Sequence, residues 1–195
     1  MPFTIQSGQS INLNTAAQLA GATPPLTSFI IGLAWNDDYA GEDFFDVDAM
    51  VVLLDANDQC TGDHDFIFYN QLKHPTGGVI HRGDDLIGGT MDEIVEVHPD
   101  KLPDDIVKIA FIMSIHEGDT NNQGFDLIVK PTAFILSMDN EVLCDYAITV
   151  ESAKEVHIAI VARLKKEVDG RCFNATSTGF KMSLVECIRS FGINV

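Results

Sequence analysis

Positive charge is the scarcest feature of this sequence. Its 195 residues include 12 Lys and Arg against 29 Asp and Glu, which gives a formal net charge of −17. Residues 36–105 contain 18 acidic side chains, while Lys73, Arg82 and Lys101 are the basic ones. Direct nucleic-acid binding is disfavoured, because there is no basic stripe to neutralise phosphates. The regional negative field instead attracts cations.

Cysteines and long apolar runs are also few. Four scattered cysteines without a C-x-x-C pair indicate reduced thiols rather than a disulfide framework: Cys60, Cys144, Cys172 and Cys187. No run approaches the roughly 20 apolar residues of a membrane span, so direct membrane insertion is not expected. The start, "MPFTIQSGQSINLN", lacks the charged and apolar regions of a signal peptide. We therefore expect a cytoplasmic protein.

Enzyme signatures are missing as well. The sequence contains no G-x-S-x-G, Walker A or G-x-G-x-x-G motif. Its six histidines never reach H-E-x-x-H spacing, since "HEGDT" ends in Thr120 where a second His is required, so a zinc site is not expected. We do not expect an enzyme. A hydrolase that uses a carboxylate pair stays open, because 29 acidic residues always offer some pair at a suitable spacing.

What the chain does contain is a series of short apolar segments. With 46% hydrophobic residues it can bury one sizeable core, so we expect a single domain over residues 1–195. Strands are predicted from short β-branched and aromatic runs bounded by turn residues, at 29–35, 49–55, 65–70, 77–82, 93–98, 108–116, 132–138 and 157–166. Few gaps could hold a helical crossover, so the fold class is mainly β, a sandwich or a barrel.

Helices are expected to be few. The segment 181–191 places Leu184, Val185, Ile188 and Phe191 on one face and ends before Gly192, which predicts a C-terminal helix. A shorter helix is predicted at 149–155. The segment 16–28, with two consecutive prolines, reads as a surface connection.

Three acidic clusters lie in the negatively charged region: "GEDFFDVDA", "TGDHDFIFYN" and "HRGDDLIGGTMDE". Residues two apart on a strand share a face, so Asp46 and Asp48 should project together, as should Asp63 and Asp65. Carboxylates that converge from a strand end and a glycine-rich loop suit Ca²⁺, which takes 6–8 oxygen ligands, better than Mg²⁺. From the residues alone, a solvated acidic surface is the competing interpretation. "DANDQCTGDHDF" is not an EF-hand, because Phe66 stands where the terminal Glu is required.

These clusters, in register with one another, resemble the TerD family of bacterial tellurium-resistance and stress-response proteins. The resemblance rests on "FDVDA", "DFIFYNQ" and the "GDDL…DE" loop, and it runs from "SGQSINL" to the C-terminal "GFKMSLVECIRSFGINV". It implies a β-sandwich of two antiparallel sheets that binds Ca²⁺ through acidic loops, without a known catalytic activity. The implied partners are other proteins of the tellurium-resistance and stress system, with a membrane-associated complex as one candidate setting.

The resemblance also implies a ligand set. Matching positions are Asp46 and Asp48 in the first cluster, Asp84 and Asp85 in "GDDL", and Asp92 and Glu93 at the end of that loop. Asn70 is a further member, while Asp63 and Asp65 brace the site.

Two departures fall within the site itself. The family loop runs roughly G-D-[ND]-x-T-G-x-G-x-G-D-D-E, whereas this one is shorter, and Phe44 and Phe45 interrupt the usual D-F-D-x-D. Since affinity follows ligand charge and rigidity, one calcium ion or weaker binding is expected where the family would hold two. The alternative is an interaction module with a reduced or lost metal site, in which the acidic face itself binds a partner.

Overall fold

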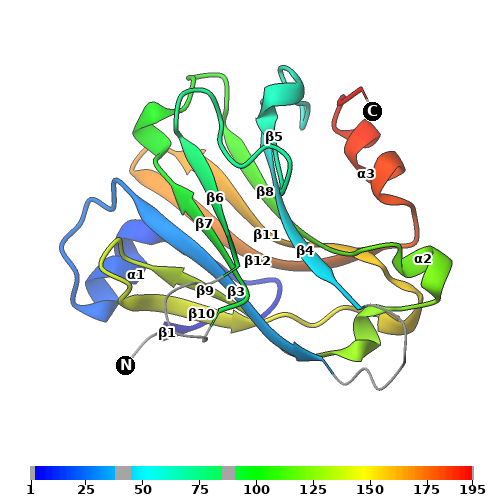
Figure 1. The fold of residues 1–195 in the computed structure, drawn as a ribbon. Helices are drawn as coiled ribbons and strands as arrows, with labels where there is room; N and C mark the ends of the chain where they lie inside the picture. The colour runs from blue at the N-terminus through cyan, green and yellow to red at the C-terminus, as the bar shows by residue number, and fades with distance from the viewer. Residues whose placement is uncertain (1–2, 38–44, 85–90, 195) are drawn as a thin grey trace.

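The computed structural model describes residues 3–37, 45–84 and 91–194. Within these described residues the chain forms two six-stranded sheets, which we call sheet A and sheet B (Figure 1). Sheet A has the order β1 (Phe3–Thr4), β10 (Val142–Ala147), β9 (Ile128–Leu136), β3 (Phe29–Asp37), β7 (Glu93–Val97) and β6 (Val79–Asp84). Sheet B has the order β2 (Ser10–Asn12), β12 (Gly170–Phe180), β11 (Ile158–Glu167), β8 (Lys108–Ile115), β4 (Val47–Leu54) and β5 (Phe66–Ile67).

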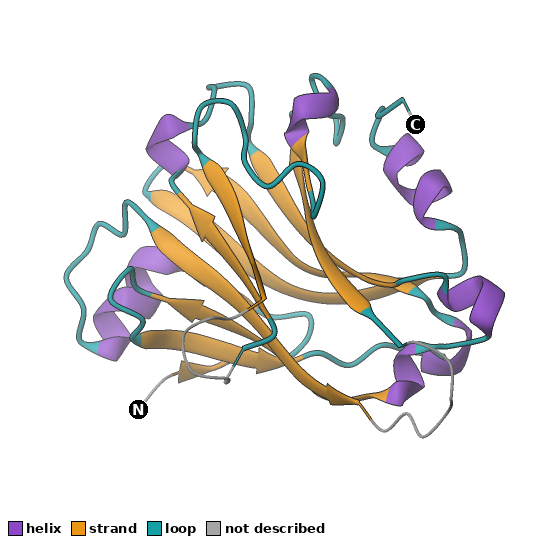
Figure 2. Cartoon of the chain, viewed as in Figure 1, coloured by secondary structure: helices purple, strands orange, loops and turns teal. Residues whose placement is uncertain are grey.

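The described strand pairs are antiparallel except β1 with β10. Figure 2 shows the sheets as two layers with short helices around them. The expected mainly β sandwich is therefore confirmed. None of the described helices is long and apolar enough to cross a membrane.

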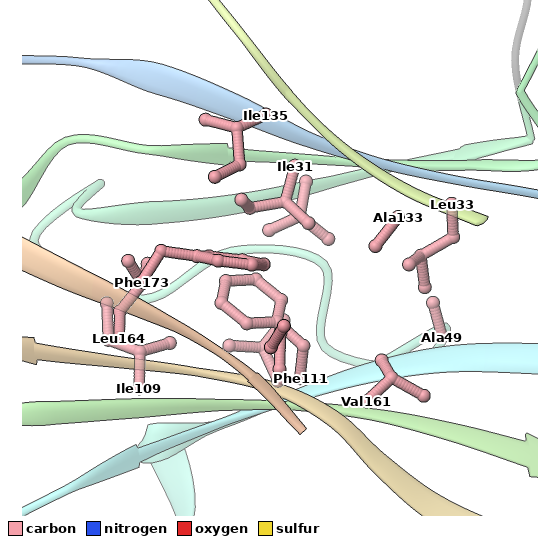
Figure 3. Packing of buried hydrophobic residues seen from close by; sticks show 14 of the residues in the cluster. Ile31, Leu33, Ala49, Ile109, Phe111, Ala133, Ile135, Val161, Leu164 and Phe173 are labelled. Carbon is pink, nitrogen blue, oxygen red and sulfur yellow. The ribbon is translucent and has the colours of Figure 1, made fainter. Parts of the chain in front are cut away.

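The main core lies between the two sheets. Sheet A contributes Ile31 and Ile135, and sheet B contributes Phe111, Leu164 and Phe173 (Figure 3). Each of these side chains is at most 1% exposed. Alternate residues of each strand point into this layer, because successive side chains on a strand face opposite sides of the sheet.

A second core covers the outer face of sheet B. Met50, Val52 and Leu54 of β4 pack there with Cys187 and Ile188 of α3 (Leu184–Ser190), while Val51 and Leu53 face the main core. Both faces of β4 are thus covered, which explains why its sequence is a continuous apolar run instead of an alternating one.

The predicted C-terminal helix is confirmed, with a shorter extent. α3 begins after Ser183, whose side chain accepts a hydrogen bond from the Glu186 N–H at 3.3 Å. The Glu186 carboxylate accepts in return from the Ser183 N–H at 2.9 Å, which completes a capping box.

Replacing Ser183 by Ala should lower the free energy of unfolding by about 1 kcal/mol, because it removes the N-cap acceptor of α3. Urea denaturation measures this. Ser7, an exposed serine near the other end of the chain, is the matched control, and its alanine variant should stay within about 0.5 kcal/mol of the parent. Equal losses for the two variants would contradict a specific role for the cap.

Other helices differ from the predictions. α1 (Leu13–Ala20) lies partly in the segment predicted as a surface connection; it is capped by Asn12 and ends at Gly21, whose φ is +85°. The predicted helix at 149–155 is wrong in extent, since a single 3₁₀ turn, η4 (Ala153–Glu155), forms there. The remaining short elements are η1 (Asp63–Asp65), η2 (Pro99–Lys101), α2 (Gly118–Asn121) and η3 (Phe125–Leu127).

Candidate functional site

Asp46 and Asp48 lie at the beginning of β4. Asp48 pairs in register with Ser114 of β8. It lies two residues before Met50 on the same strand and therefore on the same face, the outer side of sheet B. Asp46 precedes the strand, and its carbonyl accepts a hydrogen bond from the His116 N–H at 2.9 Å. Both residues are half-buried.

A pocket of about 210 Å³ opens beside Asp48. None of its described lining residues is Lys or Arg, and the polar ones include Asp48, Ser114, Glu117, Asp119, His116 and His157. Glu117 has a positive φ of 49°, which starts the short helix α2 immediately after β8. Three carboxylates around one small pocket make this a place where a cation is electrostatically favoured.

Asp92 and Glu93 lie on the other sheet, at the beginning of β7. The Asp92 carboxylate accepts a hydrogen bond from the backbone N–H of Trp35 at 2.7 Å, so it holds the end of β3. Glu93 is buried on the same face as Val95, toward the main core. Its Oε2 lies 3.7 Å from His81 Nε2.

The other predicted ligands are less fully described. Asp84 pairs with Glu93 at the end of the β6–β7 hairpin, which brings their backbones together. Asp85 lies outside the described residues, as does the rest of the loop to residue 90. Asn70 is exposed in the tight turn between Phe68 and Gln71.

His81 connects the two groups of predicted ligands. Its Nε2 donates to the carbonyl of Ala49, the neighbour of Asp48, at 2.9 Å, and it also approaches Glu93. The carboxylates themselves are not brought into one group, however, because Asp48 faces the outer pocket whereas Glu93 faces the main core. The ligand assignments from the family resemblance therefore stay predictions.

Glu117 and Asp119 are the residues that the sequence analysis missed at this pocket. Their segment, "HEGDT", lies outside the three acidic clusters of the sequence. The pairing of Val47 with Ile115 and of Asp48 with Ser114 brings the end of β8 beside the first acidic cluster. That register is a property of the folded sheet, and no local pattern in the sequence predicts it.

The predicted common face for Asp63 and Asp65 is wrong. These residues form the 3₁₀ helix η1, in which positions two apart point in different directions, and the following strand is only Phe66–Ile67. Asp63 is exposed whereas Asp65 is fully buried. The Asp65 Oδ2 accepts hydrogen bonds from the Thr61 N–H at 2.7 Å and the Thr61 hydroxyl at 2.8 Å.

The four cysteines have raised thiol pKa values. Burial raises the pKa of Cys60 to about 12 and those of Cys144 and Cys187 to about 11, and it also raises the pKa of Cys172. Because the thiolate is the reactive form, these side chains are poorly suited to direct redox chemistry with oxyanions.

Thiol labelling of the native protein at neutral pH should accordingly be slow. For Cys60, Cys144 and Cys187, a shift of the pKa from about 9 to 11 or 12 reduces the thiolate fraction about a hundredfold or more, so we expect at least that ratio between urea-unfolded and native labelling rates at these three positions. A cysteine that reacts equally fast in both states would contradict the raised pKa at that position.

Comparison with known proteins identifies the family. The family model described as the TerD domain matches residues 1–191. General stress protein 16U of Bacillus subtilis is 32% identical over 199 residues and covers 100% of both chains. A tellurium resistance protein TerD from Alcaligenes is 29% identical, covering 100% of this chain and 99% of the relative.

A solved structure shares the fold. The crystal structure of a homologue of telluride resistance protein TerD from Streptomyces coelicolor superimposes with a TM-score of 0.65 at 16% identity, covering 84% of this chain and 96% of that one. The family model spans nearly the whole chain, and the resemblance carried by the acidic motifs is confirmed. This protein belongs to the TerD family of tellurium-resistance and stress-response proteins.

Proposed function

We propose that this protein is a non-enzymatic, cytoplasmic Ca²⁺-binding member of a bacterial tellurium-resistance and stress-response system. It acts through contacts with other proteins of that system, and bound Ca²⁺ shapes the surface that they recognise. Nucleic acid is not a partner, because a chain of net charge −17 repels phosphates.

The observation that supports this proposal is the pocket beside Asp48. Its lining residues include Asp48, Glu117, Asp119 and Ser114, whose side chains carry the hard oxygen donors that Ca²⁺ takes. These residues therefore fit the ion chemically. A bound Ca²⁺ would supply the positive charge that offsets the repulsion among the three carboxylates.

The pocket also reaches the elements that a partner could contact. Met182, Ser183 and Leu184, at the beginning of α3, line the same pocket as α2 residue Asp119. Changes in the charge of the pocket would thus act on two short helical segments at the surface. α2 has only Gly118 buried, so it lies at the low end of local stability and ligand binding can order it.

Calcium titration of the melting temperature tests the proposal. A ligand that binds only the folded state adds about 2.7 kcal/mol of stability when its concentration is 100 times Kd, so the melting temperature should rise with Ca²⁺. Asp48→Asn should reduce this rise, while Asp126→Asn, which changes an exposed carboxylate elsewhere, should leave it unchanged. A melting curve that is insensitive to millimolar Ca²⁺ would contradict calcium binding.

The alternative is an interaction module that uses its acidic face without metal. Asp48 lies at the outer pocket of sheet B, whereas Glu93 of sheet A faces the main core. This separation favours the metal-free module over one calcium site that contains all of the predicted ligands. In that case Asp48→Asn should raise the free energy of unfolding slightly, because repulsion among carboxylates falls. The Ca²⁺ dependence of melting distinguishes the two functions, because Ca²⁺ should leave the melting temperatures of the parent and of Asp48→Asn unchanged if the acidic face works without metal.

A further inference from the structure

Two histidines and an aspartate come together at the far end of β4 from Asp48. His64 and Asp65 belong to η1, and His74 lies in the connection between β5 and β6. One ligand atom from each lies within 4.8 Å of the others. Because Phe66 pairs with Val52, this cluster lies about 13 Å or more along β4 from Asp48, so it is separate from the acidic pocket.

Two of the three side chains are deeply buried and direct a polar atom at each other. Asp65 is 0% exposed and His74 is 1% exposed. The Asp65 Oδ1 and the His74 Nε2 lie 3.3 Å apart, an ion-pair contact when the ring is protonated, and neither forms a hydrogen bond of good geometry with any other described residue. Buried polar atoms without such a bond are rare in native proteins and call for an explanation, such as an ion.

The other polar atom of each buried side chain is held in place. Thr61 donates two hydrogen bonds to the Asp65 Oδ2. The Thr76 hydroxyl lies 2.7 Å from the His74 Nδ1, where its oxygen can accept a hydrogen bond from Nδ1–H and leave the Nε2 lone pair free to ligate. Ligating histidines usually donate their second ring N–H in this way, which fixes the ring.

We propose that His64, Asp65 and His74 form a binding site for a divalent transition-metal ion, with Zn²⁺ as the ion that fits best. Two imidazole nitrogens and one carboxylate oxygen suit zinc, whereas Ca²⁺ requires more oxygens. Metal–ligand bonds of about 2.0–2.1 Å in tetrahedral geometry place two ligand atoms about 3.3 Å apart, and the His74–Asp65 pair already has that spacing.

His64 is the adjustable ligand. Its Nε2 lies 3.9 Å from the Asp65 Oδ1, and its side chain is 49% exposed, so it can approach without moving the core. Gly62 gives the ring its room, because a Cβ at that position would lie 2.7 Å from the His64 Cε1. The fourth position then faces solvent beside His64 and takes a water molecule. The absence of H-E-x-x-H spacing does not oppose this site, since that motif describes ligands on one helix.

The competing state is a metal-free pair. The Thr76 N–H can donate a hydrogen bond to the His74 Nδ1 at 3.3 Å, and in that tautomer the ring proton is on Nε2 and points toward Asp65. The two states differ in whether His64 takes part. Zinc binding needs His64, whereas the buried pair of His74 and Asp65 does not.

Calorimetric titration of the full chain with ZnCl₂, in millimolar Ca²⁺, tests the site. We expect one zinc ion per chain. His64→Ala should weaken binding at least tenfold without changing the metal-free melting temperature, because the side chain is half exposed. Asp126→Asn, which changes an exposed carboxylate outside both sites, should bind zinc as the parent does. Because Ca²⁺ is present throughout, failure of the zinc site is distinguishable from failure of the calcium site.

Histidine ring ¹⁵N NMR gives an independent readout. Zinc should shift the ring resonances of His64 and His74, while those of His98 and His157 stay in place. Undiminished zinc affinity in the His64→Ala variant, or unmoved His64 and His74 resonances at saturating zinc, would overturn the proposal and leave the metal-free pair.

Discussion

Replacing Phe111 by Ala is expected to lower the free energy of unfolding by about 3–5 kcal/mol. Phe111 is 1% exposed and lies in the main core between the two sheets (Figure 3). Its removal loses the transfer free energy of the ring and leaves a cavity that neighbours on two sheets cannot easily fill. That loss is a large part of the roughly 5–15 kcal/mol by which domains are stable.

Chemical denaturation of the Phe111→Ala variant provides the measurement. Phe3→Ala is the matched control, because Phe3 is 42% exposed and its truncation should change stability by less than about 1 kcal/mol. If the two variants were equally stable, Phe111 would not lie in a closely packed layer.

Replacing His81 by Ala should cost about 3 kcal/mol. The imidazole is 4% exposed, its Nδ1 accepts from the Gly83 N–H at 3.0 Å, and its Nε2 donates to the Ala49 carbonyl at 2.9 Å. The substitution removes both hydrogen bonds, one of which joins the two sheets, and takes away the imidazole beside the buried Glu93 carboxylate.

Thermal and urea unfolding of the His81→Ala variant measure this cost. His116→Ala serves as the control, since His116 is exposed and its truncation should fall within about 0.5 kcal/mol of the parent. A small effect at His81, comparable to that at His116, would show that the link between the sheets contributes little.

Strands whose buried faces are apolar could be predicted from the sequence. Met50–Leu54 is the clearest case, because every side chain in it meets either the main core or α3. β12 was missed for the opposite reason: Arg171, Phe173 and Ala175 alternate as its buried residues, so only one of them is large and apolar. Alternation of that composition gives a weak period-two signal.

The helix α1 shows that local signals were available but outweighed. Asn12 and Gly21 mark its two ends in the manner of an N-cap and a left-handed C-cap. The consecutive prolines at 24 and 25 predict a surface connection over 16–28. They follow α1 instead of interrupting it, so the first part of this segment is helical.

The candidate sites could be predicted only in part. The spacing of Asp46 and Asp48 predicts that the Asp48 carboxylate projects from one face of a strand. Its neighbours in the pocket, Glu117 and Asp119, are set by the register between β4 and β8. The same holds for His64 and His74, which meet because the chain turns through β5 between them. Contacts between segments distant in sequence depend on register and loop path, which single-sequence patterns do not encode.

Equilibrium dialysis of the full chain against Ca²⁺ tests the central claim most directly, because it counts bound ions per chain without relying on stability. Calcium binding at the pocket beside Asp48 predicts saturable uptake of Ca²⁺. The uptake should reach one ion per chain if the shortened loop has lost the second calcium ion of the family, and it should be weaker in the Asp48→Asn variant than in the Asp126→Asn control. No uptake above the free concentration at millimolar Ca²⁺ would contradict the proposed calcium function.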